Sequence, residues 1–285
     1  MKRFIRKIVL FPIGLLLAYG ILYVSYDSYL NHSFSNKDSI FIWGDSQAYQ
    51  GVDLKALSQV TRKKVYSSAH HGAGVYDFLN FVDQVPEDSE LIISISKLSQ
   101  IRRKDKDYNR TGLSFWALNQ LYGHDYSFND VFSIFKLNIK PKRNILESTK
   151  LYAYSDSMQE GLPLSHFESY YEEIPEFLDE KQDLYLIGVQ KLIDKNCKIT
   201  FLELPFQKQL KAIENRSPIK GETEAFVNQI SRLFKTFEKD TIRLDKTKNI
   251  FNDYSHLNLI GAKDLSLKLG ENLLKNKNTT LYIAQ

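Results

Sequence analysis

The sequence contains almost no cysteine: among its 285 residues, Cys197 alone carries a thiol. A single cysteine cannot form an internal disulfide, which excludes a small scaffold held together by disulfide bonds. Cys197 begins the largely apolar run 197–202, where a lone thiol is usually a small core residue. A low cysteine content fits a cytosolic protein and an envelope protein without disulfides equally well, so other features must indicate the compartment.

An excess of charge of one sign is missing as well. The chain has 38 Lys and Arg residues against 34 Asp and Glu residues, a formal net charge of +4, and a sequence pI near 8.8. Because the two signs are interleaved along the chain, we do not expect a nucleic-acid partner. The sequence also lacks internal repeats, and its 43% of hydrophobic residues suffice for a full core in one large domain or two small ones.

Charged residues are absent from residues 8–26, a largely apolar stretch near the N-terminus. The stretch is long enough to cross a hydrocarbon layer of about 30 Å as a helix. Tyrosines gather toward its far end, as interfacial aromatics do, and four Lys and Arg side chains precede it within residues 2–7. The pattern predicts a cytoplasmic basic tip and transmembrane anchor over residues 1–30, followed by an extracytoplasmic domain over residues 31–285.

A cleaved signal peptide is the alternative interpretation of this stretch. Its apolar region would be shorter and would be followed by a small-x-small cleavage site. Residues 18–20, Ala-Tyr-Gly, match such a site poorly and lie within the apolar run, and no cysteine follows to carry a lipid. We therefore favour a single anchor in the lipid bilayer, with the remaining chain in the periplasm or at the cell surface.

Strand-like and helix-like segments alternate along the rest of the chain. Short apolar runs predict strands at residues 40–43, 64–67, 91–96, 199–204 and 241–244. Helical spacing of apolar residues predicts helices at 52–57, 76–82, 177–193, 223–237 and 262–274. This alternation is typical of an α/β fold with a mostly parallel sheet.

Residues from about 102 to 175 break the alternation and are rich in Tyr, Asn and charged side chains. We interpret them as an insertion with short helices and long loops. It could be a lid, a substrate platform, a partner surface or an ordinary solvated excursion, since insertions on rigid scaffolds often carry specificity.

Two short motifs carry potential chemistry. Asp253 and His256 are three residues apart before the last predicted helix, so the carboxylate can hold one ring nitrogen while the other accepts a proton from a hydroxyl. Ser46 ends the triplet Gly44-Asp45-Ser46 just after the first predicted strand, where a tight turn would expose its hydroxyl. Each motif alone could be a turn or a helix cap. Their joint occurrence at the two ends of an α/β domain favours a catalytic Ser–His–Asp triad.

The two motifs resemble those of the SGNH (GDSL-type) hydrolase superfamily. That family has a Gly-Asp-Ser block near the start of its domain and an Asp-x-x-His block near the end, continued here over residues 256–262 as His-Leu-Asn-x-x-Gly-Ala. The resemblance spans about residues 39–274. It implies a three-layer, flavodoxin-like fold and a serine enzyme without cofactor or metal, with Ser46 as nucleophile, His256 as general base and then acid, and Asp253 as its orienting partner.

The resemblance also implies an oxyanion hole. Gly72 aligns with the glycine of the family's second block, Gly74 is the alternative donor, and the backbone amide of Ser46 supplies a second hydrogen bond. The third block of the family, Gly-x-Asn-Asp, is replaced here by Ser-Ile-Ser-Lys at residues 94–97. Ser96 falls nearest the missing Asn, so Ser96 or Lys97 could contact the oxyanion or the substrate instead. His70 and His71 predict no metal site, because adjacent histidines point apart and no third ligand stands out.

Membrane-anchored, divergent members of the superfamily act beside polytopic acyltransferases that modify cell-envelope polymers. The layout of this chain is similar. The resemblance therefore implies an esterase or O-acyltransferase that acts on an acyl ester of a cell-envelope carbohydrate, with an envelope polysaccharide and a polytopic membrane acyltransferase as partners. The absent third-block Asn supports the alternative, a non-catalytic SGNH-like domain that binds glycan or acts as a scaffold for such an acyltransferase.

Overall fold

A computed structural model describes residues 39–95, 163–168, 171–172, 178–245, 247–276 and 278–285, with isolated positions between 10 and 21 and at 116 and 120. Residues 1–37 and 38–285 form two separate compact units. Among the residues so described, none of the helices combines the length and apolarity that a membrane span requires. The predicted anchor and most of the predicted insertion at 102–175 lie outside the described residues.

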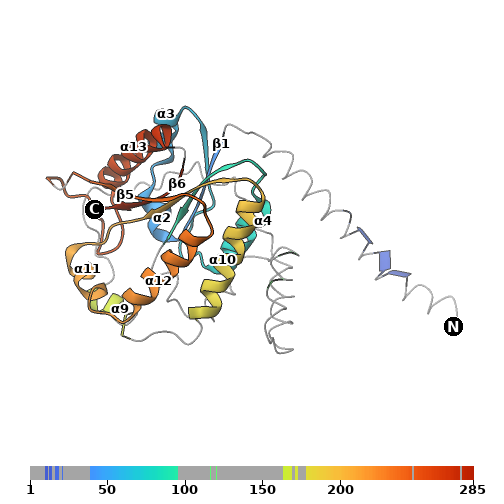
Figure 1. Ribbon diagram of the computed structural model, residues 1–285, viewed down its shortest axis with the longest axis horizontal. Coiled ribbons are helices and arrows are strands. Elements are labelled where there is room, and N and C mark those ends of the chain that lie inside the picture. The colour runs from blue at the N-terminus through green and yellow to red at the C-terminus, as the bar shows by residue number, and fades with distance from the viewer. Residues whose placement is uncertain are drawn as a thin grey trace. The chain divides into compact units, whose positions relative to one another are not determined.

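The second unit is built on a six-stranded parallel sheet with the order β2-β1-β3-β4-β6-β5 (Figure 1). The strands are β1 (Ser39–Trp43), β2 (Lys64–Ser67), β3 (Glu90–Ser94), β4 (Lys198–Glu203), β5 (Phe237–Ile242) and β6 (Thr279–Ala284). The chain winds from β1 to β2 in one direction and from β3 to β4 in the other. Open α/β sheets bind ligands beside such a reversal, at the carboxyl ends of the strands. In this sheet the carboxyl end of β1 leads into Gly44-Asp45-Ser46.

Helices cover both faces of the sheet. They are α2 (Ser46–Gly51), α3 (Leu54–Thr61), α4 (Val75–Gln84), α9 (Leu164–Glu168), α10 (Leu178–Asp194), α11 (Lys208–Glu214), α12 (Ile219–Arg232) and α13 (Leu259–Lys275). On one face α13 packs against α2 and α3, and on the other α10 packs against α4 and α12 (Figure 1). The α/β fold class is confirmed, and the layers are consistent with a flavodoxin-like fold.

Alternate side chains of β1 serve the two faces. Ile40 and Ile42 belong to the apolar cluster that includes Leu57 of α3 and Leu265 of α13. The ring of Trp43 points to the other face, 4.8 Å from the ring of Phe78 and 5.7 Å from that of Tyr185. All five residues of β1 are buried. A strand with both faces covered can be apolar throughout, and for this reason its sequence predicted it well.

The sequence-based prediction was wrong around residues 233–244. The helix predicted at 223–237 ends at Arg232, and Phe237 is the first residue of β5. Phe234, two residues after α12, and Phe237, the first residue of β5, both lie 6.0 Å from the ring of Phe201 and so pack on the same side chain. Their apolar spacing therefore did not mark the boundary. The strand predicted at 241–244 is the end of β5, and β6 and α11 were not predicted.

Candidate active site

Ser46 is the first residue of α2, directly after the carboxyl end of β1. Asp45 is the N-cap of this helix, and its Oδ1 accepts a hydrogen bond from the backbone N–H of Gln47 at 3.0 Å. A Cβ atom added at Gly44 would lie 2.4 Å from Cβ of Ala48 and 2.7 Å from Cβ of Ser94. Glycine is therefore needed for the close approach of the first turn of α2 to β3, and this packing sets the position of Ser46.

Asp253 and His256 lie on a loop whose two limbs are paired. Phe251 and Leu257 form an antiparallel bridge, and the N–H of Asn252 donates to the carbonyl of His256 at 2.8 Å. We call residues 250–258 the base loop. Inside it, Oδ1 of Asp253 accepts hydrogen bonds from the backbone N–H groups of Ser255 (2.8 Å) and His256 (2.9 Å). These bonds turn the chain so that the two side chains point the same way.

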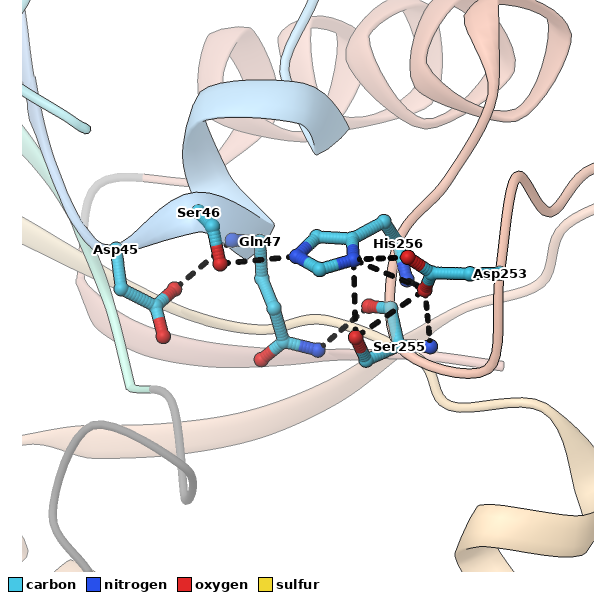
Figure 2. Close-up of polar contacts among 6 residues, drawn as sticks. All are labelled: Asp45, Ser46, Gln47, Asp253, Ser255 and His256. Atoms are coloured by element: carbon cyan, nitrogen blue, oxygen red, sulfur yellow. Dashed lines mark hydrogen bonds and ion pairs between the residues drawn. The ribbon is translucent and has the colours of Figure 1, made fainter. Parts of the chain in front are cut away.

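Three predicted residues meet in a hydrogen-bonded row (Figure 2). Oγ of Ser46 lies 2.9 Å from Nε2 of His256, and Nδ1 of His256 lies 2.7 Å from Oδ2 of Asp253. The side chains of His256 and Asp253 are 14% and 15% exposed, so they are largely shielded and still reachable. With Nδ1 donating to the carboxylate, Nε2 carries the lone pair and can accept the proton of the Ser46 hydroxyl.

The charge of Asp253 follows from its surroundings. Burial by itself raises the pKa of this carboxyl. Hydrogen bonds and charge from His256, together with the backbone amides of Ser255 and His256, outweigh burial, and the pKa is lowered below its usual value. Asp253 is therefore a carboxylate at neutral pH, which keeps the proton of the imidazole on Nδ1.

Two further residues support the row, and sequence reasoning missed both. The hydroxyl of Ser255 donates to Oδ1 of Asp253 at 3.2 Å, and it lies 3.0 Å from Nδ1 of His256. The side chain of Gln47 donates from Nε2 to the backbone carbonyl of Ser255 at 2.9 Å (Figure 2). Both residues adjoin predicted site residues in the sequence, and this adjacency was the only signal available.

The turn that carries Gly72 lies beside the start of α2. The N–H of His70 donates to the carbonyl of Gly44 at 3.1 Å, so the turn begins next to Gly44-Asp45-Ser46. Gly72 has a φ of 69°, a left-handed conformation that favours glycine. The N–H of Gly74 already donates to Oδ2 of Asp77 at 3.1 Å. The N–H of Gly74 is therefore occupied, which favours Gly72 as the donor to a ligand.

The paired histidines of the sequence have separate surroundings. Nδ1 of His70 lies 3.0 Å from the carbonyl of Ser68, and since a carbonyl only accepts, Nδ1 donates. Nε2 of His70 faces Oδ2 of Asp77 at 3.5 Å, whereas the ring of His71 packs against Tyr49. Within the described ranges, no group of three His, Cys, Asp or Glu side chains is arranged to hold a metal ion. Ser96 and Lys97, the predicted substitutes for the third-block Asn, lie outside the described residues.

Comparison with known proteins adds no relative: no protein-family model matches the chain, and no curated protein sequence matches it. The function of the chain is therefore inferred from the fold and from the geometry of Ser46, His256 and Asp253.

Proposed function

We propose that this chain is a serine esterase or O-acyltransferase of the SGNH type that acts on an acyl ester of a cell-envelope carbohydrate. The observation that carries the proposal is the row in which Ser46 Oγ lies 2.9 Å from His256 Nε2 and His256 Nδ1 lies 2.7 Å from Asp253 Oδ2. Nucleophile and base are within hydrogen-bond reach, and the base is oriented by a third group. A serine that serves only as a helix residue has no need of this arrangement.

In the proposed reaction, Oγ of Ser46 attacks the acyl carbonyl while Nε2 of His256 takes the hydroxyl proton. Asp253 stabilises the imidazolium that forms. The backbone amides of Gly72 and Ser46 hold the oxyanion of the tetrahedral intermediate, and loss of one such donor costs about 2.7–4 kcal/mol of transition-state stabilisation. The N–H of Ser46 suits this role, because the first N–H groups of a helix have no intrahelical acceptor.

Collapse of the intermediate releases the alcohol, which takes the proton from His256, and leaves the acyl group on Ser46. A second hydroxyl then attacks the acyl carbonyl with His256 again as base, the bond between the acyl group and Ser46 Oγ breaks, and Oγ takes the proton back from His256. If this hydroxyl belongs to water the chain is an esterase, and if it belongs to a sugar the chain is an acyltransferase. The same residues serve both outcomes.

The location and the substrate class are inferred from the sequence. The uncharged stretch at 8–26, preceded by Lys and Arg, supports a membrane anchor with the triad outside the cytoplasm. An envelope polysaccharide would then be the accessible acyl carrier or acceptor, and a polytopic membrane acyltransferase would be the partner that delivers the acyl group.

A second candidate is a non-catalytic SGNH-like domain that binds glycan or acts as a scaffold for a membrane acyltransferase. The specific observation in its favour is the sequence Ser-Ile-Ser-Lys at residues 94–97, which lacks the Asn that donates to the oxyanion in the family.

Covalent labelling separates the two candidates. An organophosphonate should modify Ser46, as located by peptide mass, and the modification should be lost in Ser46→Ala and His256→Ala. Ser231→Ala, which removes a half-buried serine of α12, is the matched control and should retain labelling. If the unaltered chain is not labelled, and p-nitrophenyl acetate turnover is the same in Ser46→Ala, the non-catalytic candidate is correct.

A further inference from the structure

A cavity opens at the carboxyl ends of β4 and β6. Its volume is about 800 Å³, within the range of small-molecule sites. Its walls come from three segments: the turn after β4 and the following α11, residues 248–251, and the end of β6 with Gln285. None of Ser46, Asp253 and His256 lines it, so within the described part of the chain it is separate from the triad.

Among the described residues, the ionisable side chains that line this cavity are three lysines and one glutamate: Lys208, Lys211, Lys248 and Glu203. Lys211 pairs with Glu214 at 2.9 Å and lies 3.8 Å from Glu203, and Lys248 pairs with Asp245 at 3.2 Å. Lys208 is exposed and forms no ion pair with any residue that the structure describes. Lys208 is therefore the lining lysine whose ammonium group has no carboxylate partner among the described residues, and it is the group most available to an anion.

The remaining lining has two kinds of group. Asn215, Asn249 and Gln285 contribute side-chain amides, which both donate and accept hydrogen bonds. Phe206 and Phe251 contribute aromatic rings, and most of the other lining residues are aliphatic. Side-chain amides can form hydrogen bonds with the hydroxyl groups of a sugar, and an apolar wall can pack against the C–H face of a sugar ring. The lysine ammonium groups can pair with an anion, and lysine binds phosphate as a point charge. No arginine is among the described residues that line the cavity.

From this lining we propose that the cavity is a binding site for a sugar phosphate, with the phosphate near Lys208 and Lys248 and the sugar over Phe206 and Phe251. The site would be distinct from the triad, and the proposal stands whether or not Ser46 is catalytic. It also has a structural link to the triad, since Ile250 and Phe251 belong to both the cavity wall and the base loop. A ligand in the cavity would contact the limb of the loop that leads into Asp253.

The test is isothermal titration of the purified full-length chain with glucose 1-phosphate, alongside inorganic phosphate and glucose as separate probes. We expect saturable binding of glucose 1-phosphate, weaker binding of inorganic phosphate and no detectable binding of glucose. The affinity should fall with added salt, because the pairing is electrostatic and partly exposed. It should fall by about tenfold for each of Lys208→Ala and Lys248→Ala, as expected for loss of a hydrogen bond to a charged group.

Two control variants make the result specific. Lys235→Ala removes an exposed lysine that does not line the cavity and should leave binding unchanged. Lys208→Arg keeps the positive charge and should retain most of the affinity. The proposal is overturned if glucose 1-phosphate gives no saturable heat, if inorganic phosphate binds as tightly, or if the Lys208→Ala and Lys248→Ala double variant binds as the unaltered chain does. Labelling of Ser46 in the same samples reports separately on the triad.

Discussion

The side chain of Gln47 donates a hydrogen bond across 2.9 Å to the backbone carbonyl of Ser255. Gln47 follows Ser46 in the chain and Ser255 precedes His256, so this bond joins the neighbours of the two residues whose side chains meet. Gln47 is 2% exposed, and water cannot easily replace the lost partner. The bond therefore fixes α2 relative to the base loop, independently of the bond between Ser46 and His256.

Replacing Gln47 by leucine should lower stability and slow the labelling of Ser46 together. The carbonyl of Ser255 would lose its partner inside the protein, which costs about 1–3 kcal/mol in the free energy of unfolding. Urea unfolding measures the first effect and the rate of organophosphonate labelling the second. The matched control is Gln190→Leu, which removes an exposed bond to Asp194 and should change stability by less than about 0.5 kcal/mol. Unaltered labelling in Gln47→Leu would mean that the base loop holds its position without this bond.

Asp253→Asn should abolish most of the reactivity of Ser46 while the fold persists. The amide side chain no longer requires a proton on Nδ1 of His256, so the ring can present an N–H instead of a lone pair to Ser46. The same change in a known Ser–His–Asp triad lowers kcat by about 10⁴. We expect a loss of about 10³ to 10⁴ in p-nitrophenyl acetate turnover, with circular dichroism unchanged.

The control for this variant is Asp88→Asn. Asp88 has a φ of 57°, a conformation that asparagine also tolerates, and it accepts a hydrogen bond from Asn196 at an exposed position. Its turnover should equal that of the unaltered chain. If Asp253→Asn were as active as Asp88→Asn, the carboxylate would have only the structural role of holding the base loop.

Much of the sheet follows from sequence because its central strands are buried on both faces. The runs at 40–43 and 91–93 are apolar throughout, and the burial of β1 and β3 explains why. The outer strand β5 has a different character: Glu238, Lys239 and Asp240 are exposed, so no apolar pattern marks it. It is a strand because its backbone pairs with β6, and such non-local pairing leaves little trace in local composition.

The three residues that meet could be predicted from sequence because the two motifs occur together at the two ends of the domain, although each motif alone could be a turn or a helix cap. The two residues that support them, Gln47 and Ser255, could not be found in this way. The bond from Gln47 ends on the backbone carbonyl of Ser255, and any residue type carries such a carbonyl. The resemblance already favoured Gly72 over Gly74, and the structure adds that the N–H of Gly74 donates to Asp77.

Stability at acid pH should depend on Asp253. Its pKa in the folded chain is below the value of an unfolded Asp, about 3.9, so its ionised form stabilises the fold. This contribution is complete above about pH 4 and is lost as the pH falls through the lowered pKa of the folded state. Urea unfolding of the unaltered chain should therefore show a decline below about pH 4 that is shallower in Asp253→Asn. Equal slopes in the two proteins would show that other carboxylates account for the decline.

Gly44→Ala should damage the site through packing alone. The added methyl group would lie 2.4 Å from Cβ of Ala48 and 2.7 Å from Cβ of Ser94, distances that require α2 or β3 to move. Such overpacking typically costs about 1–3 kcal/mol in the free energy of unfolding. Because α2 begins with Ser46, a displacement of α2 should also lengthen the distance from Ser46 Oγ to His256 Nε2 and slow the labelling of Ser46.

Gly221→Ala is the matched control for this variant. Gly221 lies in α12, and a Cβ atom there meets no atom within 4 Å, so the change should stabilise the chain by about 0.4–1 kcal/mol. Opposite signs for the two substitutions, with labelling slowed only in Gly44→Ala, are the expected result. If the two variants were equally stable and equally labelled, the close approach of α2 to β3 would not set the position of Ser46.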